Sequence, residues 1–296
     1  MPRLPIVAAY PLAALVALAS LGGLFIDDLY ARETANWAAQ SVGQDWVDLV
    51  FAVPWLLLSG LFAQRGSRAA LLLLAGGIVY TFYEFVIYAF ALHFNALFLL
   101  YCAVLGLSFF SLAGIALSLV HAPQASGPTP SARAAGIFLL AVGVLFALLW
   151  LKDIVGALVQ QTTPPAIVEA GTATNPVYVM DLSIVLPLHV MAGWALLRRR
   201  AWGYVLGPIM LAFGVLMALS IGGMMLVMRQ RGIEASLGVA TVMFLVSAAS
   251  GVLLTFALSD RRASRYGVAG HLFEACPRSS PRDGRAFPPS SPPVRS

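Results

Sequence analysis

A few ionisable side chains of this chain fall inside long apolar runs, and Glu84 lies well within one of them. Tyr80 and Tyr88 stand one helical turn before and after it, so positions 80, 84 and 88 share one face of a helix. At 1.5 Å per residue, Glu84 lies about 15 Å below the outer end of its run. His189, in a run of opposite direction, lies about 18 Å below its own outer end. The two side chains are therefore candidates to meet.

Further polar side chains fall in the same outer half of the runs. They are Asp45, Asp48, Lys152, Asp153, Asn175 and Asp181. An ionised side chain at the middle of a bilayer costs roughly 3 kcal/mol, so such a residue normally faces the bundle interior with a partner or water. The inner half carries almost nothing titratable. The sequence thus places its buried polar chemistry toward one side of the membrane.

Three interpretations of this cluster stay open. In the first, Lys152 pairs with Asp181 or Asp153 and Glu84 pairs with His189 or tyrosine hydroxyls, which only holds helices together. In the second, an outward-opening ligand cavity or a proton relay uses these groups. The candidates for that pathway are Glu84, His189, Asp181, Asp48, Tyr80, Tyr88 and Lys152. In the third, they serve a metal-dependent intramembrane hydrolase, although no HExxH or similar spacing fixes the ligands. We assign no catalytic residue, no metal and no cofactor, and whether the chain is an enzyme stays open.

The composition indicates that lipid surrounds most of the chain. Hydrophobic residues make up 60% of the 296 positions and charged residues 10%, with a mean hydropathy of +0.86. A soluble domain carries roughly 25% charged residues. The apolar runs are continuous and about 17 to 25 residues long, which favours spanning helices over the alternating strands of a barrel. We predict an all-α polytopic membrane bundle of about eight transmembrane helices.

The predicted spans follow the apolar runs. They cover residues 6–26, 46–62, 69–91, 96–119, 134–158, 177–197, 202–228 and 237–258. A short interfacial helix is expected between residues 27 and 45. The membrane domain then covers 1–258, and the Arg-, Ser- and Pro-rich segment 259–296 is expected to be a disordered cytoplasmic tail. Residues 1–19 resemble a cleavable signal peptide, but the apolar character continues to Ile26, which favours a retained helix.

Orientation follows from the cations in alternate loops. One set of loops holds ten: Arg3, Arg65, Arg68, Arg133, Arg198, Arg199, Arg200, Arg261, Arg262 and Arg265. The other holds four: Arg32, Lys152, Arg229 and Arg231. The positive-inside rule then predicts a bacterial inner-membrane protein with both termini in the cytoplasm. The net charge of +5 is explained by this orientation, so we expect the lipid bilayer and no nucleic acid as partner.

Several short stretches resemble uncharacterised bacterial multi-pass membrane proteins. They are Arg65-Gly66-Ser67, the tyrosine-rich segment 80–88, and segments 95–101 and 175–182. The resemblance covers about positions 30 to 230 and implies no activity, substrate or residue role.

The sequence suggests small-molecule or proton-coupled transport, because Pro54 and Pro187 interrupt two spans and broken helices are common at transporter binding sites. No similarity between spans one to four and spans five to eight is visible by inspection, which counts against a carrier built from duplicated halves. A structural or accessory subunit is the alternative, and the hydrolase is the third. The ligand and any protein partner stay undetermined.

Overall fold

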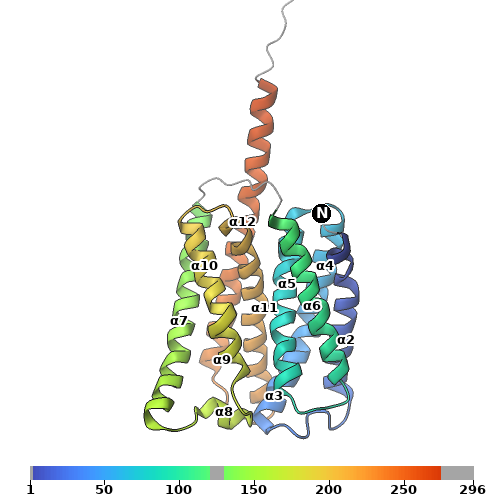
Figure 1. The fold of residues 1–296 in the computed structure, drawn as a ribbon, viewed down its shortest axis with the longest axis vertical. Helices are drawn as coiled ribbons and strands as arrows, with labels where there is room; N and C mark the ends of the chain where they lie inside the picture. Colours follow the sequence, from blue (N-terminus) through green and yellow to red (C-terminus); the bar gives the residue numbers. More distant parts are fainter. Residues whose placement is uncertain (1–2, 121–129, 275–296) are drawn as a thin grey trace, which may run out of the picture.

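The computed structural model describes residues 3–120 and 130–274, which form helices joined by short turns (Figure 1). Eight stretches are long and apolar enough to cross a membrane. They are Arg3–Phe25, Ala35–Gln64, Arg68–Ala91, Phe98–Leu119, Pro130–Gln160, Pro176–Leu197, Gly203–Gln230 and Leu237–Ser259. The predicted all-α bundle of about eight membrane-spanning helices is confirmed.

Three spans contain more than one helical element. The first joins α1 (Arg3–Val7) to α2 (Ala9–Phe25). The second joins α3 (Ala35–Val47), the π-helical turn η1 (Asp48–Ala52) and α4 (Val53–Gln64). The sixth joins α9 (Pro176–Met180), the π-helical turn η2 (Asp181–Val185) and α10 (Leu186–Leu197).

The other elements are single helices. They are α5 (Arg68–Ala91), α6 (Phe98–Val120), α7 (Pro130–Gln160), the short α8 (Pro165–Ala170), α11 (Gly203–Gln230) and α12 (Leu237–Glu274). The chain's first residues and the extension of α12 lie at one end of the bundle, and α8 and the start of α3 lie at the other (Figure 1). We call these the terminal end and the α8 end.

The outer surface of the bundle is apolar. Phe90 is 80% exposed, Leu99 79% and Phe110 72%. Large apolar side chains in such numbers on a surface are stable where lipid, rather than water, covers them.

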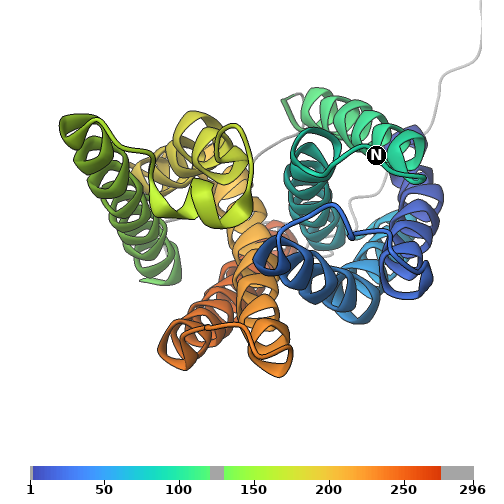
Figure 2. The same ribbon diagram turned by 90° about the horizontal axis from the view of Figure 1, so that it is seen from below.

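The eight spans form two four-helix units, which Figure 2 shows side by side. Unit one consists of α1 to α6 and unit two of α7 to α12. Within each unit every span packs on the next, and the fourth returns to the first through contacts of α2 with α6 and of α7 with α12. Both units thus have the same order and packing of helices.

The backbone of the second span of unit one recurs in unit two. Asp48 and Asp181, 133 positions apart, each begin a π-helical turn in which the residue five positions later donates its N–H to the aspartate carbonyl. The same separation relates Leu49 to Leu182, Pro54 to Pro187, Gly60 to Gly193 and Arg65 to Arg198. After both spans the chain takes a left-handed turn, with φ of 89° at Gly66 and 55° at Arg199. Before both lies another such turn, with φ of 59° at Asp28 and 53° at Gln161.

The two halves, which show no similarity by inspection of the sequence, thus share a backbone pattern. Five identical residues spread over a long apolar segment do not stand out in a sequence where most positions are Leu, Ala, Val or Gly. The repeat becomes visible in backbone hydrogen bonds and dihedral angles. Because each unit has an even number of spans, both cross the membrane in the same direction.

The two units meet along equivalent surfaces. Their third spans, α5 and α11, pack on each other, while α3 packs on α11 and α5 packs on α9. In this set of contacts α5 of unit one corresponds to α11 of unit two, and α3 corresponds to α9. Each contact therefore has an equivalent when the two units are exchanged, as at an interface with two-fold symmetry. Glycines allow the close approach: a β-carbon at Gly43 would lie 2.6 Å from Met224 Cα, and one at Gly76 would lie 2.4 Å from Ala212 Cβ.

Two expectations about connecting segments need correction. No separate interfacial helix lies between residues 27 and 45, because Ala35–Val47 is the first part of the second span and buries Trp37, Ala39 and Val42. The segment 259–274 is helical rather than disordered, since α12 continues to Glu274 and its Arg and Ala residues favour helix where no proline intervenes. Residues 275–296 lie outside the described residues.

Replacing Gly43 by alanine should lower the free energy of unfolding by about 1–3 kcal/mol, because the added methyl group meets the backbone of α11. Gly106→Ala is the matched control, since a β-carbon there has no neighbour within 4 Å and alanine favours helix by about 1 kcal/mol. Thermal unfolding of both variants in one detergent, followed by tryptophan fluorescence, makes the comparison. Equal melting temperatures would contradict the close packing of the two units.

Candidate functional site

A cavity of about 320 Å³ lies where the two units meet. Its walls come from α3 and α5 of unit one and from α7 and α9 to α12 of unit two, and α8 lines it at the α8 end. The volume is in the range of small-molecule sites, which are concave and mainly apolar with a few placed polar groups.

Aromatic rings and methionines form much of the wall. The rings include Trp37, Tyr83, Tyr88, Trp150 and Phe213, and the methionines are Met217, Met224, Met225 and Met243. Methionine side chains adapt to ligands of varied shape because they are flexible and polarisable. The methionines of α11 are thus part of a cavity wall as well as apolar filling.

Glu84 is the polar group that stands out in this wall. Its side chain comes from α5, the residue is 4% exposed, and neither carboxylate oxygen has a hydrogen-bond donor. Leaving a buried charged acceptor without a donor is costly. Glu84 is therefore either protonated or available to a cationic or donating ligand.

Asp48 lies behind Glu84, away from the cavity. Tyr80 donates to Asp48 Oδ1 at 2.8 Å, and Gln44 Nε2 donates to the same oxygen at 3.2 Å. Gln44 in turn bonds Tyr80 and accepts from Ser220 of α11. This network joins unit one to the third span of unit two.

The carboxyl groups of Asp48 and Glu84 lie against each other. Asp48 Oδ2, like both oxygens of Glu84, has no other donor. Two neighbouring carboxyl groups in a dry interior oppose each other's ionisation, so the pair favours a bound proton. The pair is thus a candidate proton-binding site beside the cavity.

A second buried acid, Asp45, is fully satisfied. Tyr30 donates to Asp45 Oδ2 at 2.8 Å, and Tyr88 donates to Oδ1 at 3.1 Å. Burial, followed by the neighbouring Asp45 carboxyl, raises the pKa of Tyr30, so its hydroxyl stays protonated and serves as donor. Gly23 makes room for the pair, because a β-carbon there would lie 1.9 Å from Asp45 Oδ2.

The π-helical turns place the two repeated aspartates. A proline inside a helix has no N–H to donate and its ring collides with the carbonyl four residues earlier. Pro54 and Pro187 each follow a π-helical turn, whose wider ring of backbone atoms accommodates them. Asp48 and Asp181 begin these turns, so both side chains occur at an irregular point of a span.

Asp181 and His189 lie on the unit-two side of the cavity. Trp150 Nε1 donates to Asp181 Oδ2 at 2.8 Å. His189 Nδ1 lies 2.8 Å from the Val185 carbonyl, which requires the proton on Nδ1, and its ring meets Phe213 edge-on. When neutral, the ring then has an acceptor at Nε2.

The structure brings together most of the predicted site residues. Glu84, Tyr88, Asp181 and His189 line one cavity, and Asp48 and Tyr80 lie directly behind Glu84. Lys152 is different: it is exposed, and Asp181 is bound by Trp150 instead of by this lysine. Three residues of the network were not predicted from the sequence: Gln44, Ser220 and Tyr30, which are uncharged and have partners on other helices.

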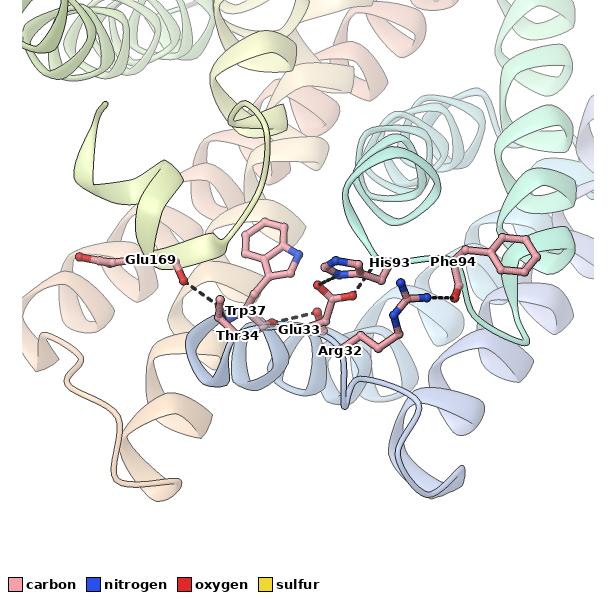
Figure 3. A network of polar contacts seen from close by, with 8 residues as sticks. Arg32, Glu33, Thr34, Trp37, His93, Phe94 and Glu169 are labelled. Carbon is pink, nitrogen blue, oxygen red and sulfur yellow. Dashed lines mark hydrogen bonds and ion pairs between the residues drawn. The ribbon is translucent and has the colours of Figure 1, made fainter. Parts of the chain in front are cut away.

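A polar network fixes the α8 end of the cavity (Figure 3). Thr34 donates to the Glu169 carbonyl at 2.7 Å and thereby joins the start of α3 to α8. Glu33 accepts from the His93 backbone N–H at 2.7 Å and lies 3.0 Å from the His93 ring. Arg32 reaches the Phe94 carbonyl at 3.4 Å. These contacts tie α8, α3 and the turn after α5 into one rim.

Within the described residues, no three His, Cys, Asp or Glu side chains converge as metal ligands. The metal-dependent hydrolase therefore has no ligand set in this part of the chain. Comparison with protein-family models, curated proteins and solved structures finds no match.

Tyr30→Phe should destabilise the protein by about 1–3 kcal/mol, because Asp45 Oδ2 loses its donor in a buried site. Tyr10→Phe is the control, since Tyr10 lies near the start of α2, far along that helix from Gly23 and the Asp45 pair. Thermal unfolding of the purified variants measures the effect. A Tyr30 variant as stable as the Tyr10 variant would show that the hydrogen bond is dispensable.

Proposed function

We propose that this integral membrane protein transports a small molecule through the cavity between its two units, coupled to proton binding at Glu84. The observation that carries the proposal is the buried Glu84 carboxyl group, which has no donor and lines the cavity. An intramembrane carboxyl group in a ligand-sized cavity is typical of substrate and proton pathways.

The repeat of the two units supports transport. Many carriers consist of two related halves that rock against each other around a central site. Here the cavity lies at the junction of two such units, and the second span of each is interrupted by a π-helical turn. The chain thus has two bodies whose relative movement would open the cavity toward either end.

We further propose that the terminal end faces the cytoplasm of a bacterial cell. The ten cations of the first loop set flank the ends of the spans on that side, as the positive-inside rule requires. The α8 end, with its polar rim, then faces outward. Both termini are cytoplasmic in this arrangement.

Proton coupling follows from the contact between Glu84 and Asp48. With one shared proton the pair carries one negative charge, and with two it is neutral. A ligand that donates to Glu84 or carries positive charge competes with these protons, so its passage and the movement of protons become linked.

The packing gives less support to an accessory subunit. A structural or accessory subunit would use small residues on its helix faces to pack against partner helices, but such residues are used within this chain. A β-carbon at Gly203 would meet Ala195, one at Gly207 would meet Leu196, and Ser247 donates to the Val215 carbonyl at 2.9 Å.

Alternating access predicts that a cysteine in the cavity reacts from both sides of the membrane. In a background with Cys102 and Cys276 replaced by serine, Met217→Cys should be labelled by a membrane-impermeant maleimide in both right-side-out and inverted vesicles. Gly106→Cys, at a helix surface with open space around it and lipid outside, should be labelled in neither.

Labelling of Met217→Cys from the α8 side alone would refute transport. It would leave a receptor-like cavity that opens in one direction. Purified protein of each variant, tested with the same reagent in denaturant, confirms that the thiol itself is intact.

A further inference from the structure

We propose that the ligand of the cavity is a hydrophobic organic monocation, an amine with an apolar or aromatic body, whose charge is balanced by Glu84. The inference rests on the cavity of the proposed function but not on its transport step.

The charges of the wall select a cation. Glu84, Asp181 and Glu169 belong to the residues that line the cavity, whereas no lysine or arginine does among the described residues. An anionic ligand would have to enter this acidic, apolar space without a cationic partner, which is costly. A positive charge instead meets a carboxyl group that lacks a donor.

The hydrogen-bonding groups select a donor. Neither oxygen of Glu84 makes a hydrogen bond, so the group can accept from a ligand once it has lost its proton, and neutral His189 with its proton on Nδ1 has an acceptor at Nε2. An ammonium group has N–H donors and no acceptor, which complements these groups. The deep part of the cavity thus matches the polar end of an amine.

The apolar walls select a hydrophobic body. Aromatic rings attract a cation through their faces, and Trp37, Tyr88 and Trp150 all belong to the lining. Met217, Met224 and Met225 supply a flexible apolar surface for the rest of the ligand. A strongly hydrated inorganic ion would make no apolar contacts with these rings and methionines.

The cation competes with the proton that Glu84 shares with Asp48. Three other titratable groups lie near this pair: Asp45 on α3, and Tyr80 and Tyr88 on α5. Further titratable groups line the same cavity: Tyr83 on α5, Glu169 on α8, Tyr178 on α9, Asp181 on η2 and His189 on α10. From α11 the neighbours Ser220 and Met217 are uncharged. Where the pair holds two protons, binding of the cation should release one of them, so binding should weaken as the pH falls.

The test uses the purified full chain and two cations: benzylammonium, which has the N–H donors that the proposal requires, and benzyltrimethylammonium, a permanent cation that does not itself titrate and tests the charge alone. Neopentylbenzene, the neutral isostere of benzyltrimethylammonium, and the anion benzoate are the comparison ligands. Calorimetry should show that the cations bind more tightly than either comparison ligand. Glu84→Gln should weaken cation binding by about ten- to a hundredfold, the effect of losing one charge-assisted contact, and should leave neopentylbenzene unaffected.

Glu234→Gln is the matched control, because Glu234 is an exposed acid outside the cavity lining. It should bind the cations as the natural chain does. If neither cation binds more tightly than neopentylbenzene, or if folded Glu84→Gln binds the cations unchanged, the proposal is overturned. If Glu84→Gln does not fold, the test uses the natural chain alone. Cation binding to the natural chain that neither releases a proton nor weakens at lower pH would also overturn the proposal.

These outcomes are separable from those of the transport test. Cation binding with Met217→Cys labelled from the α8 side alone would retain the ligand class and remove transport. Labelling from both sides without cation binding would retain transport and remove the ligand class.

Discussion

The central constraint on this structure is that the buried acids of unit one, within the described residues, are bound by uncharged donors rather than by a cation. Asp45, Asp48 and Glu84 lie close together in unit one, and each is at most 4% exposed. Tyrosine hydroxyls and the Gln44 amide donate to Asp45 and Asp48, whereas neither oxygen of Glu84 makes a hydrogen bond. Because Gln44 also binds Ser220 of α11, the same network holds the two units in register. The packing of α3 against α11 and the protonation of the cluster thus depend on each other.

The two units share the repeat but differ in the side chains around the repeated aspartates. Asp48 and Asp181 occupy equivalent places, but their partners do not correspond. Asp181 is bound by Trp150, and the position 133 residues before Trp150 is Ala17, which cannot donate from its side chain. His189 corresponds in the same way to Leu56, which is fully buried. Unit one has therefore kept the aspartate inside a closed polar network, while unit two presents it at the wall of a cavity.

Hydropathy was sufficient to predict the spans, because a chain in lipid must satisfy its backbone within each helix and must present apolar side chains outward. The depth of Glu84 and His189 also predicted that they would lie near one another, and both line the cavity. The partners of the acids could not be predicted, since Gln44 and Ser220 are 176 positions apart and neither is charged. The start of α3 was misjudged because its Asn, Gln and Ser residues look solvent-exposed, whereas several of them face the interior of the protein. The repeat was missed because backbone geometry, more than residue identity, carries it.

The difference between Asp45 and Glu84 bears most directly on function. An acid that merely holds helices together gains most from donors at both oxygens, and Asp45 has them in Tyr30 and Tyr88. Glu84 lies one helical turn before Tyr88 on the same helix, yet neither of its oxygens makes a hydrogen bond within 3.5 Å. A glutamine at this position would fill a similar volume without the cost of a buried acid. A carboxyl group at this position therefore fits a site that binds and releases a proton, or a cation in place of the proton.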